Sequence, residues 1–265
     1  MFTVLQFEHL SSFPSLAHFV TTRANGQSQG AYASLNMGFH TADNPAHVLA
    51  NRQSLASQVG IPLAQFCVPR QVHGKVVQVV TEADAGKGAT GFADSIPEAD
   101  GLVTQAKELC LMVLSADCGT MLFYDPKKEV IGATHAGWRG AVQQIGLATL
   151  QLMADTFGTD PKDVLVGYGP CISVAHYEVG EEVVADVEKA FGKREPFLQW
   201  NDATKRYHLD LEVCNLLPLM EGGIPEANFQ TLHYCTYHHE DLFFSSRRDQ
   251  GITGRMGTGI MLRNL

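Results

Sequence analysis

Three short segments of this sequence contain residue types that can do chemistry. Gln71-Val72-His73-Gly74 precedes a β-branched stretch, and Ser115-Ala116-Asp117-Cys118 follows the most apolar run of the chain. Residues 134–140, Thr-His-Ala-Gly-Trp-Arg-Gly, follow another apolar run and begin a helical pattern. Clefts in open sheets form where buried strands end. Titratable residues at two such ends therefore predict a functional site there.

A metal site is one interpretation of these segments. His73, Cys118 and His135 offer two imidazoles and one thiolate. Three such ligands leave one tetrahedral position open, as in catalytic rather than structural zinc sites. The three residues are too far apart in sequence to form a zinc finger. Spacing alone therefore favours a plainer reading, in which Cys118 belongs to the core and the histidines are hydrogen-bonded turn residues.

A cysteine nucleophile is a second interpretation, with Cys118 and His135 as a thiol and its base. Asp117 is adjacent to Cys118. Neighbouring residues on a strand face opposite sides of the sheet. We therefore expect Asp117 to cap backbone groups or support the site, and not to complete a catalytic triad.

Several arginines could hold a small anion. Arg139 lies at a predicted helix start, where free N–H groups favour negative charge. Arg247 and Arg248 lie near the C-terminus, and Arg23 precedes a Gly-, Ser- and Asn-rich loop that ends near Asn36. Taken singly, each arginine fits a surface ion pair better than an anion site.

Composition limits the class of protein. The chain has 265 residues, of which 45% are hydrophobic and 18% charged, with a formal net charge of −9. This composition excludes intrinsic disorder and disfavours non-specific binding to nucleic acid polymers or anionic membranes. The first basic residue is Arg23, no apolar run approaches the length of a membrane helix, and the six cysteines form no Cys-x-x-Cys pair. We therefore expect a cytoplasmic protein whose cysteines are mostly buried and reduced.

The elements that must position these residues alternate irregularly along the chain. Hydrophobic patterns predict strands over 75–80, 109–114, 121–124 and 129–133, and later over 229–235, 242–246 and 259–262. Helical spacing predicts helices over 142–153, 181–191 and 209–220, the last interrupted by Pro218. Without a regular βαβ rhythm, the pattern indicates an α/β or α+β fold with mixed sheets in one compact unit, residues 1–265.

Taken together, these segments resemble one known family. The matching pieces run in family order over nearly the whole chain: Thr22-Arg23, Ser34-Leu35-Asn36, Gln71-Val72-His73-Gly74, Ala99-Asp100-Gly101-Leu102-Val103-Thr104, Ser115-Ala116-Asp117-Cys118, His135-Ala136-Gly137-Trp138-Arg139-Gly140, Gly169-Pro170-Cys171-Ile172, Tyr177-Glu178-Val179, Phe243-Phe244-Ser245-Ser246-Arg247-Arg248-Asp249 and Thr253-Gly254-Arg255. The chain resembles the laccase-domain family, also called multicopper polyphenol oxidases or purine nucleoside phosphorylases of the bacterial peptidoglycan-editing type.

The resemblance implies a fold and a site. It implies a single four-layer α/β/β/α domain over residues 1–265 with mixed sheets, similar to deamidating toxin catalytic domains. It implies that His73, Cys118 and His135 are the catalytic metal ligands, with zinc as the metal and copper as the alternative. With the arginine pattern, it makes six residues candidate substrate contacts: Arg23, Asn36, Gln71, Arg139, Arg247 and Arg248.

The resemblance also implies activity. It implies phosphorolysis of adenosine, inosine, guanosine and methylthioadenosine, a transferase reaction with phosphate as co-substrate, and hydrolytic deamination of adenosine. A copper-dependent polyphenol oxidoreductase, laccase-like, is the second reading, although the chain has only 11 histidines, most outside the matching motifs. A cytoplasmic editing factor for peptidoglycan precursors is the third.

Two departures from the family pattern concern the expected site. The chain has Gly119-Thr120 where relatives commonly have a proline soon after the Asp-Cys pair, and Ser246 where an aromatic residue is common. We expect the first to alter the wall beside the metal and the second to alter local substrate contacts.

Overall fold

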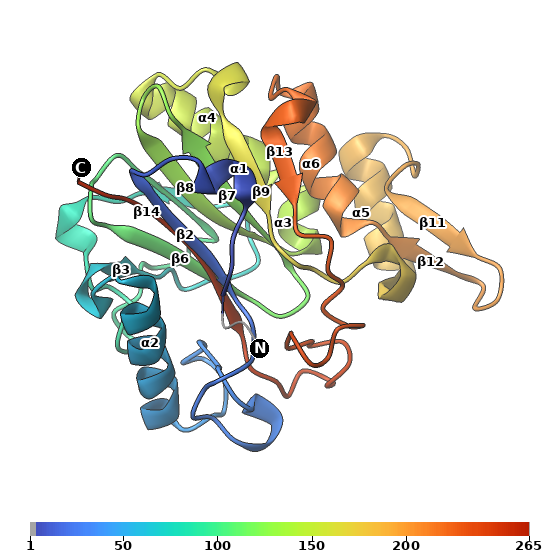
Figure 1. Cartoon of the computed structure of the whole chain (residues 1–265). Coiled ribbons are helices and arrows are strands. Elements are labelled where there is room, and N and C mark those ends of the chain that lie inside the picture. The colour runs from blue at the N-terminus through green and yellow to red at the C-terminus, as the bar shows by residue number, and fades with distance from the viewer. Residues whose placement is uncertain (1–3, 265) are drawn as a thin grey trace.

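The structure is a computed structural model that describes residues 4–264. Two mixed β-sheets lie face to face, and a smaller sheet lies at one end of the molecule (Figure 1). The first sheet has the strand order β1-β2-β14-β6-β3, the second β13-β9-β7-β8-β5-β4, and the small sheet β10-β12-β11. Parallel pairs (β3 with β6, β4 with β5, β13 with β9) occur beside antiparallel ones, which confirms the predicted mixed sheets.

The strand bounds are as follows. The five-stranded sheet contains β1 (Val4–Leu5), β2 (Leu16–Thr21), β14 (Met256–Leu262), β6 (Cys110–Ser115) and β3 (Phe66–Cys67). The six-stranded sheet contains β13 (Phe229–Thr231), β9 (Leu165–Tyr168), β7 (Gly119–Asp125), β8 (Val130–Ala136), β5 (Gly101–Thr104) and β4 (Val77–Val79). The small sheet contains β10 (Glu178–Val179), β12 (Arg206–Leu209) and β11 (Leu198–Asn201).

Helices cover the outer faces of the two large sheets. The helix α2 (Pro45–Val59) lies against the five-stranded sheet, and α3 (Trp138–Val142), α4 (Ile145–Phe157) and α6 (Leu211–Glu221) lie against the six-stranded one (Figure 1). The short α1 (Glu8–Ser11) packs beside β2, and α5 (Glu181–Phe191) accompanies the small sheet. The layers therefore follow the order helix, sheet, sheet, helix, as the family resemblance implies.

The strand β6 shows why this layering suits the sequence. Leu111 and Val113 face the core between the two sheets, whereas Cys110, Met112 and Leu114 face the core under α2. A strand covered on both faces has no position for an exposed polar residue. The uninterrupted apolar run at 109–114 is the direct consequence.

Most predicted elements are confirmed, and the exceptions have physical reasons. The pattern over 142–153 divides between α3 and α4, because Gln144 adopts a left-handed backbone with φ of 58°. Pro218 lies within α6 without ending the helix. The strand expected over 229–235 ends at Thr231. The strand expected over 242–246 is wrong: Phe243 and Phe244 are buried against Ala116 and Met256 in a turn-rich segment that pairs with no strand.

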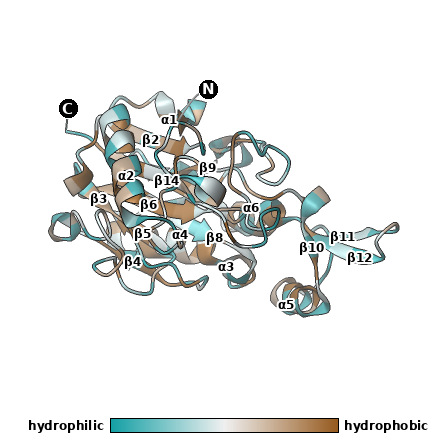
Figure 2. Cartoon of the chain, turned by 90° about the horizontal axis from the view of Figure 1, so that it is seen from below, coloured by the Kyte–Doolittle hydropathy of each residue, from teal (hydrophilic) through white to brown (hydrophobic). Residues whose placement is uncertain are grey.

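The two large sheets are more apolar than the end of the molecule that carries the small sheet. Figure 2 shows apolar colour gathered in the strands of the large sheets, whereas the β11–β12 hairpin is largely hydrophilic and projects outward. Within residues 4–264, none of the helices combines the length and the apolarity that a membrane crossing requires.

The buried His18 on β2 leads to a first prediction. Its Nε2 accepts a hydrogen bond of 2.8 Å from the Phe7 N–H, and burial lowers the pKa of the ring from 6.5 to about 4. Between these two values the unfolded chain binds more protons than the folded protein, so acid destabilises the fold in that window. We expect the loss to reach about 2 kcal/mol between about pH 7.5 and about pH 5.

Urea unfolding of His18→Gln, whose side chain accepts the same bond but does not titrate, measures this effect. The variant should lose about 2 kcal/mol less than the wild type over that pH interval. The exposed His233 provides the matched control, and His233→Gln should behave like the wild type. Equal pH dependence of His18→Gln and wild type would contradict the assignment.

Candidate metal centre

Three predicted ligands from separate parts of the chain converge. His73 lies in the loop before β4, Cys118 in the turn between β6 and β7, and His135 near the end of β8. Their ligand atoms all lie within 4.8 Å of one another, and no other group of three such residues occurs within residues 4–264. The imidazole rings of His73 and His135 lie edge to face, with centroids 4.9 Å apart.

The buried Asp100 carboxylate connects two of these ligands. Its Oδ1 accepts hydrogen bonds from the His135 Nδ1 at 2.9 Å and from the His73 backbone N–H at 3.0 Å. Its Oδ2 accepts from the N–H groups of Val72 at 3.1 Å and Gly74 at 2.8 Å. An ionised carboxylate only accepts, so Nδ1 of His135 carries its proton and Nε2 faces the ligand cluster. A carboxylate–histidine pair of this kind commonly orients histidine ligands in metal sites.

Buried carboxylates also hold the two turns that present ligands. His73 and Asp117 have positive φ angles of 60° and 85°, a region that non-glycine residues rarely adopt. Asp100 fixes the first turn by the backbone contacts above. Asp117 fixes the second, since its carboxylate accepts from the Thr236 hydroxyl and the Arg247 N–H, both at 2.6 Å. Asp117 therefore supports the turn, as its place beside Cys118 predicts.

In the metal-free protein, the ligand cluster favours the ionised form of Cys118 and the protonated form of His135. Burial opposes ionisation of the Cys118 thiol, but His135 and His73 outweigh burial and lower its pKa to about 6. Burial likewise opposes protonation of His135, yet Cys118 and Asp100 raise its pKa to about 9. A thiolate beside an imidazolium results. Binding a metal requires the imidazolium to release its proton, because ligands bind in their deprotonated forms.

The donor set and its surroundings fit a metal ion. A thiolate with two imidazoles suits zinc or copper. Gly137 provides the room, because a Cβ at this position would lie 2.8 Å from the Cys118 sulfur and 3.4 Å from the His73 ring. The glycine is therefore required by the close approach of the backbone to two ligands.

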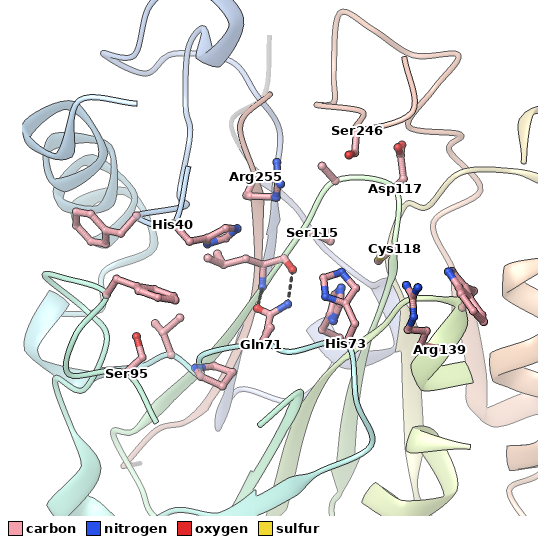
Figure 3. Close-up of a pocket in the computed structure, with 18 of the residues that line it drawn as sticks. His40, Gln71, His73, Ser95, Ser115, Asp117, Cys118, Arg139, Ser246 and Arg255 are labelled. Carbon is pink, nitrogen blue, oxygen red and sulfur yellow. Dashed lines mark hydrogen bonds between the residues drawn. The ribbon is translucent and has the colours of Figure 1, made fainter. Parts of the chain in front are cut away.

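A cavity of about 460 Å³ opens over the three ligands. Figure 3 shows Arg139 on one side of His73 and Cys118, and His40 and Arg255 on the other. The lining also includes the aromatic residues Phe39, Phe92, Trp138 and Tyr177, together with Ser95 and Arg247. The size is typical of small-molecule sites, and aromatic rings with guanidinium groups suit a flat anionic or heteroaromatic ligand.

Three of the six predicted substrate residues line this cavity. Arg139 is exposed and stacks on Trp138, with its Cζ 4.3 Å from the ring centroid. Arg247 lies over Tyr177 and donates to the Glu178 carbonyl at 2.9 Å. Gln71 also lines the cavity, but its amide pairs with the Leu114 backbone in both directions, at 2.7 and 2.8 Å (Figure 3). Its polar groups are thus engaged in holding the wall.

The other three lie outside the cavity lining, which does not support the predicted substrate contacts. Arg23 donates to the carbonyls of Ala33 and Glu240 in a separate surface hollow. Arg248, beside it, pairs with Asp249 and donates to three backbone carbonyls. Asn36 is fully buried, where its amide organises a loop. The polar groups of all three side chains already have hydrogen-bond partners within the protein, in both backbone and side chains.

The structure also reveals three residues at this site that the sequence does not identify. His40 and Arg255 line the cavity, whereas the buried Asp100 does not line it and contacts His73 and His135. A carboxylate directly before an apolar strand was the available signal for Asp100, because a buried acid requires partners. Of the two departures from the family pattern, Gly119-Thr120 lies outside the residues that line the cavity, whereas Ser246 is among them.

The chain matches known proteins over most of its length. The family described as multi-copper polyphenol oxidoreductase laccase matches residues 17–263. Purine nucleoside phosphorylase YlmD of Geobacillus stearothermophilus is 38% identical over 89% of this chain and 86% of its own length. Its crystal structure superposes with a TM-score of 0.92, covering 99% of both chains at 35% identity.

Two further relatives carry related names. The purine nucleoside phosphorylase of Bacteroides thetaiotaomicron is 35% identical over 98% of this chain and 96% of its own length. A protein named adenosine deaminase RL5, from an unknown prokaryotic organism, is 30% identical over 98% of this chain and 99% of its own. Given the extent of these matches, the chain belongs to the family described as multi-copper polyphenol oxidoreductase laccase.

Proposed function

We propose that this protein is a metal-dependent purine nucleoside phosphorylase that also deaminates adenosine. The observation that carries the proposal is the arrangement of the cavity, in which the His73, Cys118 and His135 cluster lies between guanidinium groups on both sides. Relatives named purine nucleoside phosphorylase and adenosine deaminase support it. The substrates we expect are adenosine, inosine, guanosine, methylthioadenosine and inorganic phosphate.

Phosphorolysis requires an anion to be held against a nucleoside. A phosphate oxygen forms a bond to the ribose anomeric carbon as the bond to the purine nitrogen breaks, and the purine leaves with that electron pair. Arg139 and Arg247 hold the phosphate at the cavity mouth by charge and by forked hydrogen bonds. Zinc, or copper as the alternative, supplies a Lewis acid when bound to the three ligands.

Arg255 supplies positive charge on the opposite side. Its Nη1 donates to the carbonyls of Thr253 and Gly254, both at 2.9 Å, which fixes the guanidinium at the cavity wall. Gly38 packs against its stem, where a Cβ would lie 3.0 Å from the Arg255 Cγ. The side chain is thus held in place before any ligand arrives, which reduces the ordering cost of binding.

The aromatic residues give the base a place to bind. Phe92 is 41% exposed and lies near His40, with ring centroids 6.0 Å apart. Such a surface offers an apolar face to a purine. Deamination at the purine C6 then requires the nucleoside to bind with its base toward the ligand cluster, in a second orientation of the same cavity.

The copper oxidase reading receives less support from the site. A laccase uses several coppers held by many histidines, whereas one group of three ligands occurs within the described part of the chain. The nucleoside proposal needs one such group together with anion-binding side chains, and the cavity holds both.

Product analysis with adenosine tests the proposal. Metal-replete protein with phosphate should yield adenine and ribose phosphate, and without phosphate it should yield inosine. Arg139→Ala should raise the KM for phosphate about 10- to 100-fold, because a hydrogen bond to a charged group contributes about 1.5–3 kcal/mol. The same variant should change inosine formation little.

Arg206→Ala, which removes an exposed arginine from the β11–β12 hairpin, is the matched control and should behave as wild type. If metal-replete protein forms neither adenine nor inosine, the nucleoside assignment is contradicted. An unchanged KM for phosphate in Arg139→Ala would instead remove this arginine from the phosphate site.

A further inference from the structure

A second cavity, behind the ligand turn, contains a pair of cysteines. Cys171 and Cys235 both line this cavity, together with His176, His238 and His239. The two cysteines are partners in an isolated parallel β-bridge between the segments after β9 and β13. Neither residue belongs to the His73, Cys118 and His135 cluster.

The spacing of this pair matches that of a disulfide. Adjacent strands lie about 4.8 Å apart, and paired residues carry their side chains on the same face. Disulfide-bonded residues have Cα atoms about 4.4–6.8 Å apart. Two cysteines at paired positions that also line one cavity therefore have backbones close enough for a disulfide.

Cys235 is the more accessible of the two and has the partners of a nucleophilic thiol. It is half-buried, and its sulfur accepts a hydrogen bond from the Ser173 N–H at 3.3 Å. The same sulfur lies 3.5 Å from Nδ1 of His176. Burial and the nearby His238 and His208 lower the pKa of His176, so this imidazole is available as a base near neutral pH. A thiol with an adjacent base is the usual arrangement of a reactive cysteine.

Cys171 has the properties of a second, resolving thiol. It is only 6% exposed, and burial raises the pKa of its thiol well above the ordinary value. A buried neutral thiol does not react with a solvent oxidant on its own. It can react with a neighbouring cysteine that has already been oxidised.

We propose that Cys235 and Cys171 form a reversible oxidation site that reacts with hydroperoxides. The Cys235 thiolate, having passed its proton to His176, attacks the terminal OH oxygen of the hydroperoxide. An S–O bond forms as the O–O bond breaks, so Cys235 becomes a sulfenic acid, and the departing oxygen takes the proton back from His176 and leaves as an alcohol or water. The Cys171 sulfur then attacks the Cys235 sulfur, the S–O bond breaks, and water leaves with the Cys171 proton. Two thiols are thereby oxidised to one disulfide and one hydroperoxide is reduced.

The location links this site to the metal centre. The Thr236 N–H donates to the Cys171 carbonyl at 3.0 Å, and the Ile172 N–H donates to the Asp117 carbonyl at 2.9 Å. The Thr236 hydroxyl also binds the Asp117 carboxylate. Each cysteine is therefore adjacent in sequence to a residue that holds the turn carrying Cys118. The disulfide would join these two supports covalently.

Mass spectrometry of hydrogen peroxide-treated, zinc-loaded protein tests the proposal. The wild type should lose two free thiols per chain, give one linked peptide containing Cys171 and Cys235, and recover both thiols with dithiothreitol. Cys235→Ser should prevent the linkage. Cys171→Ala should leave Cys235 as a sulfenic acid that dimedone captures. Cys214→Ser, a buried cysteine of the same hydrophobic cluster, is the control and should form the linkage at the wild-type rate.

The base assignment has its own measurement. His176→Asn should slow oxidation of Cys235 at neutral pH about tenfold, because fewer thiolates form. Oxidation of wild-type Cys235 to sulfinic acid without linkage, or a disulfide involving another cysteine, would overturn the proposal. An unchanged oxidation rate in His176→Asn would remove the histidine from the reaction. None of these results depends on nucleoside turnover.

Discussion

Replacing His73 by alanine is expected to remove both the bound metal and the enzymatic activity. The variant keeps the turn, since Asp100 binds the backbone N–H of residue 73 and not its ring. Only Cys118 and His135 then remain as ligands. Two ligands from one face of a cavity hold zinc far more weakly than three, so we expect metal affinity to fall more than about 100-fold. Metal analysis after gel filtration, together with adenosine turnover, measures the effect.

The same variant distinguishes a metal enzyme from a cysteine hydrolase. A Cys118–His135 nucleophile pair has no need of His73, whereas a metal site does. Chelation should abolish wild-type turnover, and added zinc should restore it. In metal-loaded protein, Cys118 should resist iodoacetamide, because the thiolate lone pair is engaged.

His40→Ala is the matched control for His73→Ala, since His40 lines the same cavity but is not in the ligand group. It should retain one metal per chain. Chelator-resistant turnover with rapid alkylation of Cys118 in the metal-loaded protein would instead favour the nucleophile.

Asp100→Asn is expected to weaken metal binding although Asp100 is not a ligand. The carboxylate faces four N–H donors, two on each oxygen. An amide has one oxygen, so its NH₂ group must face either the Val72 and Gly74 N–H groups or the His73 N–H and His135 Nδ1. The first arrangement opposes donors to donors. The second requires His135 to accept at Nδ1, which places its proton on the nitrogen that must bind the metal.

We expect Asp100→Asn to lower zinc affinity about 10- to 100-fold, in the range typical of residues that orient metal ligands. Competition with a chromophoric chelator measures this affinity. Asp125→Asn is the control, because this buried carboxylate accepts backbone N–H groups of Lys127 and Lys128 in the β7–β8 turn and contacts no ligand. It should lose stability but keep the wild-type affinity. Equal affinities of Asp100→Asn and wild type would show that Asp100 only stabilises the fold.

Local patterns in the sequence determined the elements and the residue types of the site. The apolar run at 109–114 predicts β6 because the strand is covered on both faces, and the helical stripe at 181–191 predicts α5 within the same bounds. The chemistry of His73, Cys118 and His135 makes a metal site one interpretation of the sequence, and the family resemblance favours it over the plainer one. Such features depend on neighbours within a few residues, which the sequence shows directly.

Only the tertiary structure decided which residues meet. The β7–β8 register pairs Thr120 with His135 and Gly119 with Ala136, which brings the turn at Cys118 beside His135. The same long-range packing turns Arg139 and Arg247 toward the cavity but saturates Arg23 and Arg248 with backbone carbonyls. Four arginines that look equivalent in sequence thus differ in their surroundings, because the fold places two of them at the cavity and gives the other two hydrogen-bond partners outside it.

The 242–246 segment and Asp100 are two further features that local sequence patterns do not predict. Phe243 and Phe244 have the composition of a strand, but they pair with no strand and pack against Ala116 and Met256 in a turn-rich segment. Asp100 has no local feature that marks it as the connection between His73 and His135. Its role comes from the loop before β4 and the strand β8 meeting at its carboxylate. Hydrogen-bond partners across the sheet are set by the fold, and the sequence records only that a buried acid must find them.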